Sequence, residues 1–158
     1  MIDTSLIKSN SLFADFSDGQ LAKLAAIFSE RSFKAGETVI PERAENKEMM
    51  ILVEGRVAVE VSMSLSASAE KTVVTMEDTP GRIIEWSTAI DTTKAGATAS
   101  ARAVADTRVI VAEGGDVLKI LQQDKELGWK FMHKILLVIA SRLKDTRLQL
   151  VSMAAQCR

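Results

Sequence analysis

The stretch EMMILVEGRVAVEVSM, residues 48–63, indicates which class of structure this chain forms. Two runs rich in apolar residues meet at Glu54-Gly55, and the second run alternates valine with other residues. Side chains alternate between the two faces of a strand, so the valines would share one face. Glycine at the junction supplies the positive φ that a tight hairpin turn requires. We therefore predict two β-strands joined as a hairpin at Gly55.

The same two-residue period continues on both sides of this stretch, from Arg31 to Glu113. Turn signals such as Ala35-Gly36 and Ala105-Asp106 separate short β-rich runs at intervals typical of a sandwich or barrel. We count about eight strands, and short antiparallel runs of this kind close best as a jelly roll. The predicted fold class is mainly β with flanking helices, a double-stranded β-helix (jelly-roll).

Helical patterns flank the β region at both ends of the chain. SDGQLAKLAAIFSE begins with two N-cap candidates, Ser17 and Asp18. After Gly115, GGDVLKILQQD predicts a short helix, and the following apolar-periodic stretch predicts a long one of about 29 residues. A chain of 158 residues corresponds by default to one domain. We expect a single domain, residues 1–158, with an N-terminal helical segment (1–30), a β-roll (31–113) and C-terminal helices (115–153).

The long C-terminal helix carries a heptad pattern that predicts a homodimer. Seven of its eight a and d positions are apolar, and Thr146 is the exception. Ile135 and Val138 widen the apolar face, which also suits packing on the chain's own β-roll. Arg142 and Arg147 would meet across a parallel dimer as like charges, which an acidic group or a bound anion would relieve. The eight positions of this heptad seam are Trp129, Met132, Leu136, Ile139, Leu143, Thr146, Leu150 and Met153.

Composition disfavours several classes of function. The 20 basic and 21 acidic residues leave a net charge of −1, with no basic stripe for a phosphate backbone, so we expect no nucleic-acid binding by this chain alone. The single histidine, His133, and single cysteine, Cys157, make a catalytic dyad or a transition-metal site hard to assemble. We therefore predict no catalytic residues, no metal and no enzymatic activity.

Sequence signals for membranes and secretion are weak. The longest apolar run, Ile135 to Ala140, is far shorter than the roughly 20 residues that span a bilayer. The first ten residues have neither a basic region nor a long apolar region, so no secretory signal is indicated. One cysteine cannot pair within the chain, which favours a reducing compartment. We expect a cytoplasmic protein without membrane contact.

The order of these features resembles a known family. Phe33, Gly36 and Glu37 precede the Gly-turn stretch, which is followed by a Glu-bearing loop at Gly81 to Ile90 and a small-residue run at Ala97 to Ala101. This order is similar to the cyclic nucleotide-binding domain family of the catabolite activator protein and the protein kinase A regulatory subunit. The resemblance covers roughly Leu12 to Leu150. Each motif alone is weak, and the order and spacing make the assignment specific.

The resemblance implies roles for particular residues. In that family the Glu-bearing loop is the phosphate-binding cassette, F-G-E-x-A-L followed after a gap by P-R-x-A-T-x-x-A. The matching segment is PGRIIEWSTAIDTTKAGATASA, residues 80–101. Glu85 would accept a hydrogen bond from the ribose 2′-hydroxyl, and Thr146 holds the base-contacting position. The N–H groups of Trp86, Ser87 and Thr88 would face the cyclic phosphate, with Ala97 and Thr98 in the A-T strand.

Two positions depart from the family pattern. Ile84 stands where the family has glycine, and Ala95 stands where it has the phosphate-binding arginine. Lys94 lies one residue earlier, and a shift of the loop would bring its ammonium to the phosphate, although lysine lacks the bidentate fork of arginine. Losing one charge-assisted hydrogen bond costs about 1.5–3 kcal/mol, roughly ten- to hundredfold in affinity.

These observations predict a regulatory ligand-sensing module. It would bind cAMP or cGMP in the β-roll, need no other cofactor, and couple binding to the C-terminal dimerisation helix and an unknown effector protein. The alternative is a degenerate cassette that binds another small anion or no ligand and serves dimerisation or partner docking. A cupin-like enzyme is disfavoured because the β region contains no histidine. Only eight residues follow Leu150, so we expect no helix-turn-helix domain in this chain.

Overall fold

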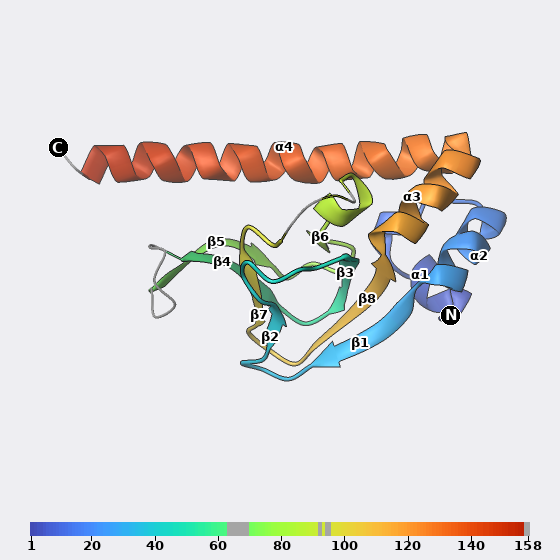
Figure 1. The fold of residues 1–158 in the computed structure, drawn as a ribbon, viewed down its shortest axis with the longest axis horizontal. Coiled ribbons are helices and arrows are strands. Elements are labelled where there is room, and N and C mark those ends of the chain that lie inside the picture. Colours follow the sequence, from blue (N-terminus) through green and yellow to red (C-terminus); the bar gives the residue numbers. More distant parts are fainter. Residues whose placement is uncertain (63–69, 92, 94–95, 157–158) are drawn as a thin grey trace.

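The computed structural model describes residues 1–62, 70–91, 93 and 96–156. In this part of the chain, eight strands form two four-stranded antiparallel sheets, flanked by short N-terminal helices and a long C-terminal helix (Figure 1). The predicted jelly-roll class with flanking helices is confirmed. The strands are β1 (Ser29–Phe33), β2 (Thr38–Ile40), β3 (Glu48–Glu54), β4 (Val57–Ser62), β5 (Lys71–Glu77), β6 (Ile83–Glu85), β7 (Ser100–Ala103) and β8 (Thr107–Glu113).

The strands on either side of Gly55 do not pair with each other. One sheet has the order β1-β8-β3-β6 and the other the order β2-β7-β4-β5, so β3 and β4 belong to different sheets. The predicted hairpin is therefore wrong, although the turn lies where expected and Gly55 has a φ of 100°. A Cβ on Gly55 would lie 2.5 Å from the backbone oxygen of Asp106. The turn thus packs closely on the β7–β8 connection while the chain crosses between sheets.

The helices follow the predicted order with corrected bounds. Residues 1–30 contain three short helices and not one continuous helical segment, and β1 already begins at Ser29. Ser17 is the N-cap of α2, because its side chain accepts from the Gln20 N–H while the Gln20 side chain accepts from the Ser17 N–H. The helices are α1 (Thr4–Lys8), η1 (Ser11–Phe13), α2 (Asp18–Ile27), η2 (Ser87–Ala89), α3 (Gly114–Gln123) and α4 (Lys125–Gln156).

Four aromatic rings join the N-terminal helices to α4. The rings of Phe13 and Phe16 lie with centroids 6.3 Å from that of Phe131 on α4, and Phe28 lies 6.3 Å from Phe13. Buried aromatic side chains contribute most of the packing energy where they cluster. This cluster belongs to the larger of two hydrophobic cores, which lies between the helices and the sheet that contains β3 and β8.

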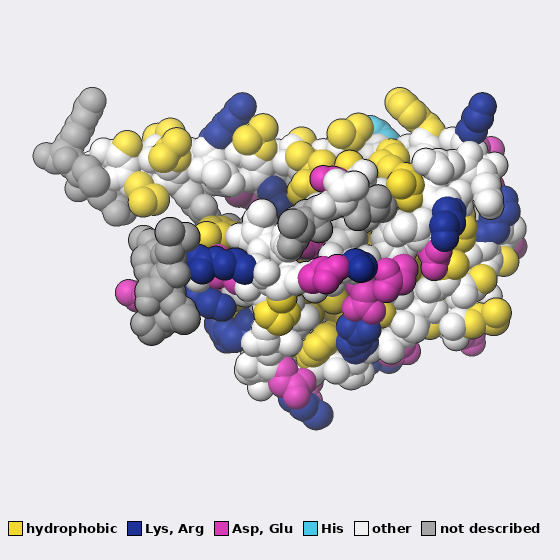
Figure 2. Space-filling view, viewed as in Figure 1, with side chains coloured by type: hydrophobic (Ala, Val, Ile, Leu, Met, Phe, Trp, Pro, Cys, Tyr) yellow, Lys and Arg dark blue, Asp and Glu magenta, His cyan; other side chains and the backbone are white. Residues whose placement is uncertain are grey.

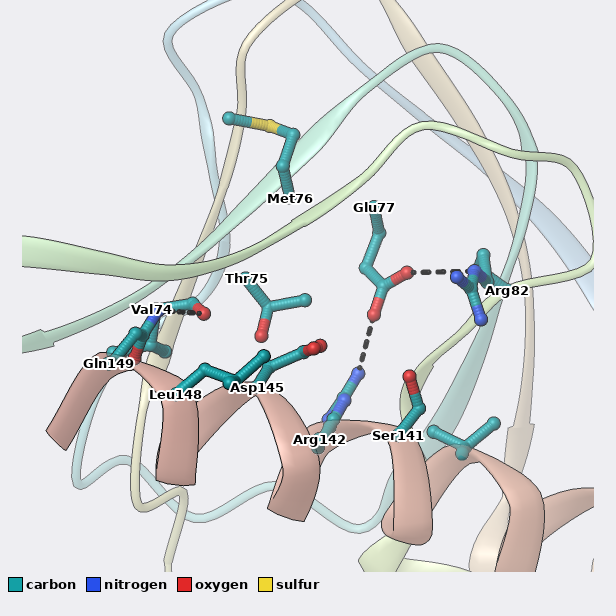
Figure 3. Close-up of a pocket in the computed structure, with 11 residues that line it drawn as sticks. Val74, Thr75, Met76, Glu77, Arg82, Ser141, Arg142, Asp145, Leu148 and Gln149 are labelled. Atoms are coloured by element: carbon teal, nitrogen blue, oxygen red, sulfur yellow. Dashed lines mark hydrogen bonds and ion pairs between the residues drawn. The ribbon is translucent and has the colours of Figure 1, made fainter. Parts of the chain in front are cut away.

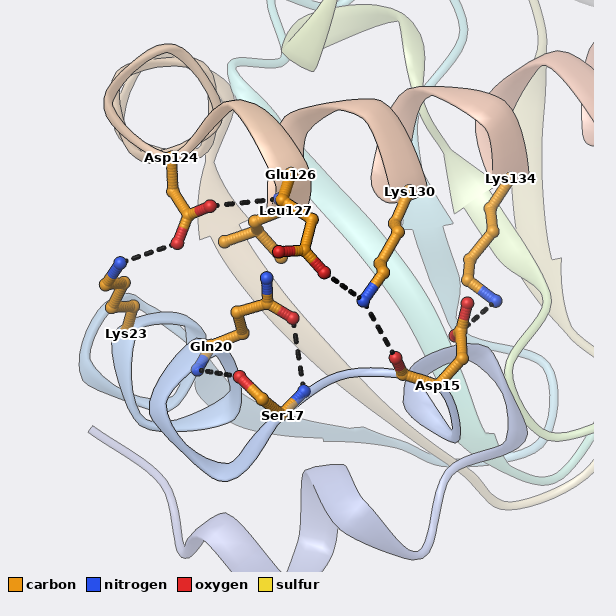
Figure 4. A network of polar contacts seen from close by, with 9 residues as sticks. All are labelled: Asp15, Ser17, Gln20, Lys23, Asp124, Glu126, Leu127, Lys130 and Lys134. Atoms are coloured by element: carbon orange, nitrogen blue, oxygen red, sulfur yellow. Dashed lines mark hydrogen bonds and ion pairs between the residues drawn. The ribbon is translucent and has the colours of Figure 1, made fainter.

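Ion pairs surround the beginning of α4 (Figure 4). Asp124 accepts from the Leu127 N–H at 3.0 Å and from Lys23 Nζ at 2.6 Å, so it caps α4 and ties it to α2. The Lys23 hydrogen bond and then the Leu127 N–H hold the pKa of Asp124 below its ordinary value. The stabilisation from this carboxylate is therefore present above the pKa of an unfolded aspartate and is lost as the pH falls through the lowered value.

The helix α4 packs with one stripe and exposes another. Leu127, Phe131 and Ile135 are fully buried on the chain's own core. Of the heptad seam, Met132 and Ile139 pack partly against the same core, while most of its large apolar side chains are exposed. Figure 2 shows hydrophobic side chains along the outer edge of α4. The same helix therefore packs on the chain's own core and also leaves apolar side chains exposed for the predicted dimer. Among the described residues, no helix is long and apolar enough to span a membrane.

Candidate functional site

A cavity of about 240 Å³ opens between the two sheets, beside the segment 80–101. Its walls come from β2, β4, β6, β7, the η2 turn and α4, which brings distant parts of the chain together. Four of the eight predicted ligand-contacting residues line it. The lining residues are Ile40, Val59, Ile84, Glu85, Trp86, Ser87, Thr98, Ala99, Ser100, Ala101 and Arg142.

Glu85 lies at the end of β6 and is held by the following turn. Its Oε1 atom accepts from the Ser87 N–H at 2.7 Å and from the Ser87 hydroxyl at 2.5 Å. The strand pairing of Glu85 with Met50 fixes the backbone at the same point. The carboxylate is therefore positioned on the cavity wall by two hydrogen bonds from a residue that is itself part of the predicted cassette.

The other predicted cassette residues differ in whether they line the cavity. Thr88 does not line the cavity; its side chain is buried, and its hydroxyl oxygen has no hydrogen-bond partner among the residues described. Thr98 lines the cavity, while the buried Ala97 pairs through its backbone with Arg43 and Ala44. Both precede β7, which begins at Ser100, so they lie just outside the strand predicted to contain them. Lys94 and Ala95 lie outside the described residues.

Arg142, and not Thr146, is the α4 residue that reaches the cavity. Its Nη2 atom donates to the backbone oxygens of Ile83 at 2.9 Å and Ile84 at 3.1 Å, and to Glu77 Oε1 at 3.2 Å. Thr146 is exposed, and its hydroxyl donates to the Arg142 backbone oxygen at 2.9 Å. The guanidinium thus links α4 to the two residues that precede Glu85.

The sequence of this chain matches the model of one protein family. Residues 30–124 match the cyclic nucleotide-binding domain. The chain belongs to the cyclic nucleotide-binding domain family. Among curated proteins, none matches this chain. By family and fold, it is a regulatory cyclic nucleotide-binding domain.

Solved structures support the same fold. A candidate cyclic nucleotide-binding protein from Geobacter metallireducens is 27% identical, with a TM-score of 0.68 over 90% of this chain and 99% of that chain. A cyclic nucleotide-binding domain from Methylobacillus flagellatus is 17% identical, with a TM-score of 0.75 over 95% and 81%. The catabolite activator protein of Thermus thermophilus is 17% identical, with a TM-score of 0.70 over 90% and 62%.

Ile84 gives this cyclic nucleotide-binding domain an apolar wall where the family pattern has glycine. Ile84 is 4% exposed and belongs to the smaller hydrophobic core, between the two sheets. The backbone oxygen of the same residue accepts from Arg142. The side chain therefore narrows the cavity on one side, while the backbone helps to hold α4 in place. Trp86 is half-buried and packs against the larger core.

The sequence contained one signal for the role of Arg142. Its charge at the edge of the heptad seam predicted a contact with an acidic group or an anion. In the structure the acidic group is Glu77 of β5. The partner could not be identified in advance, because Glu77 and Arg142 are 65 positions apart. Only the closing of α4 over the β-roll brings the two side chains together.

Proposed function

We propose that this domain binds a cyclic nucleotide, cAMP or cGMP, in the cavity between the sheets and transmits occupancy to α4. The observation that carries this proposal is the cavity wall itself, which holds Glu85 from the cassette and Arg142 from α4. Ligand contact with both residues would couple binding to the position of the helix. A cytoplasmic setting, a separate effector protein and the absence of catalysis belong to the same proposal.

The lining of the cavity suits a nucleoside with one anionic group. Ile40, Val59 and Ile84 provide an apolar side for a base or sugar, while Glu85 and Arg142 provide an acceptor and a cation. Glu85 is the proposed acceptor for the ribose 2′-hydroxyl. The N–H groups of Trp86, Ser87 and Thr88 and the ammonium of Lys94 are the proposed phosphate contacts. Thr146 is the proposed base contact, and because it is exposed and does not line the cavity in this structure, α4 must shift for that contact to form. The Ser87 N–H must leave Glu85 for this arrangement to form.

Calorimetric titration with cAMP and cGMP tests the ligand. We expect binding by the wild type and a loss of about ten- to hundredfold in Glu85→Ala, because one charge-assisted hydrogen bond to the ribose disappears. The 2′-deoxy analogue of the better ligand should bind the wild type as weakly as that ligand binds Glu85→Ala. Glu54→Ala, which removes an exposed carboxylate at the far end of β3, should bind normally. The absence of binding heat with either nucleotide at millimolar concentration would contradict the proposal.

The exposed heptad seam supports a homodimer through α4. Trp129, Leu136 and Leu150 are 71%, 58% and 67% exposed, which is unusual for large apolar side chains in a regular pattern. The like-charge contact that opposed a parallel dimer would be relieved, since the Arg142 guanidinium is paired with Glu77 of β5. We propose two copies that pack along this seam.

Leu143→Glu is expected to raise the dissociation constant of the dimer by about a hundredfold, because it replaces two leucines that the proposed seam would bury with two like charges. Sedimentation equilibrium measures this constant directly. Leu137→Glu is the matched control: Leu137 is 58% exposed on the same helix but lies off the seam. Dissociation by Leu137→Glu with no effect of Leu143→Glu would place the interface on the other face of α4.

Two observations favour the alternative function. Ile84 fills space where the family pattern has glycine, and the Ser87 N–H is bonded to Glu85 in this structure. A cassette closed in this way would bind another small anion or nothing, and the domain would act through dimerisation and docking of a partner. Intact dimerisation without heat from either cyclic nucleotide would select this function.

A further inference from the structure

Glu77 is a buried carboxylate that holds α4 against β5 (Figure 3). The residue is 4% exposed, and a buried charge requires partners. Two arginines provide them: Arg142 Nη2 lies 3.2 Å from Oε1, and Arg82 Nε lies 3.5 Å from Oε2. The Arg142 side chain is 23% exposed and that of Arg82 is 50% exposed, so the contact with Arg142 is the less screened of the two.

The Arg142 guanidinium has donor capacity that its present contacts do not use. Within the described part of the chain, Nη2 donates all three hydrogen bonds of this guanidinium, although it carries only two N–H groups. The Nε atom is buried and has no hydrogen-bond partner in the described part of the chain. A guanidinium offers five N–H donors in a planar fork, which matches an anion with two oxygens better than it matches this set of acceptors.

Arg142 also separates two cavities. It lines the cavity of about 240 Å³ that contains Glu85, and a second cavity of about 360 Å³ between β5 and α4 that contains Glu77 and Arg82. Glu77 lines only the second cavity. A ligand between the sheets and the Glu77 carboxylate would therefore approach the same guanidinium from different cavities.

We propose that Glu77 competes with the anionic group of the bound ligand for Arg142 and thereby sets the affinity of the cavity. This inference rests on the proposed function, since it concerns the ligand of that same cavity. An anion that gains Arg142 weakens the contact with Glu77, which holds the C-terminal half of α4 near β5 together with the hydrogen bond from Gln149 to the Val74 oxygen. The energy of ligand binding is thus partly used to loosen α4.

Glu77→Gln tests the competition, because it removes the charge and keeps the shape. Charge-assisted hydrogen bonds are about twice as strong as neutral ones, so we expect cAMP or cGMP to bind about five- to tenfold more tightly than to the wild type. Glu60→Gln is the matched control: Glu60 is buried and bonded to Arg102, which lines neither cavity. The Glu60→Gln variant should bind the cyclic nucleotide with the same affinity as the wild type. Glu77→Asp, which withdraws the carboxylate from Arg142, should also raise the affinity for the cyclic nucleotide.

A double-mutant cycle shows whether Glu77 acts through Arg142. In an Arg142→Gln background the gain from Glu77→Gln should fall below about twofold, since the shared cation is gone. A gain that persists there, or equal affinity of the wild type and both Glu77 variants, overturns the inference. If neither cyclic nucleotide binds any variant, the proposed function fails, and titration with inorganic phosphate decides the inference: tighter phosphate binding by Glu77→Gln supports it, and equal or absent binding overturns it.

Discussion

Replacing Phe131 with alanine is expected to lower the free energy of unfolding by about 3–5 kcal/mol. Its side chain is fully buried, and its ring lies 6.3 Å from the rings of Phe13 and Phe16. Removal of the ring would leave a cavity at the point where α4 is anchored to the N-terminal helices. The same change should therefore disturb the position of α4 as well as the stability of the domain.

Urea denaturation followed by circular dichroism measures the effect of Phe131→Ala. Leu137→Ala is the control on the same helix, because Leu137 is 58% exposed and its truncation should change the free energy by less than about 0.5 kcal/mol. A cost below about 1 kcal/mol for Phe131→Ala would show that the aromatic cluster does not anchor α4.

The second large effect is expected at Gly114, the first residue of α3. A Cβ at this position would lie 2.2 Å from the backbone oxygen of Thr88 and 2.4 Å from its carbonyl carbon. Neither atom can move without moving η2, the turn that carries the cassette. Gly114→Ala should therefore cost about 3 kcal/mol, at the upper end for overpacking. It should also weaken ligand binding, because the cavity wall at Ser87 moves with the turn.

Gly115→Ala provides a control one residue away. Nothing lies within 4 Å of a Cβ at Gly115, and the position is within α3. Alanine there should raise the stability by about 0.5–1 kcal/mol through its better helix propensity. Thermal unfolding and calorimetric titration of both variants separate the two effects. Equal stability of Gly114→Ala and Gly115→Ala would contradict the close approach of α3 to η2.

Several features of this fold depend only on neighbours along the chain. Strand periodicity, the positive φ at Gly55, the Ser17 N-cap and the existence of a long helix were all predictable, because each depends on a few consecutive residues. The position of the cassette was predictable from family resemblance. The hairpin at Gly55 was predicted wrongly, because a glycine turn is compatible both with a hairpin and with a crossing between sheets.

By itself, the sequence determined the class of fold, the order of its elements and the segment that carries Glu85. Only the tertiary structure decided which strands pair, that Arg142 and not Thr146 reaches the cavity, and that Glu77 is its buried partner. The physical reason is the range of the interactions. Side-chain periodicity and turn conformation are set by neighbours along the chain, whereas an ion pair between β5 and α4 exists only after both have packed on the same β-roll.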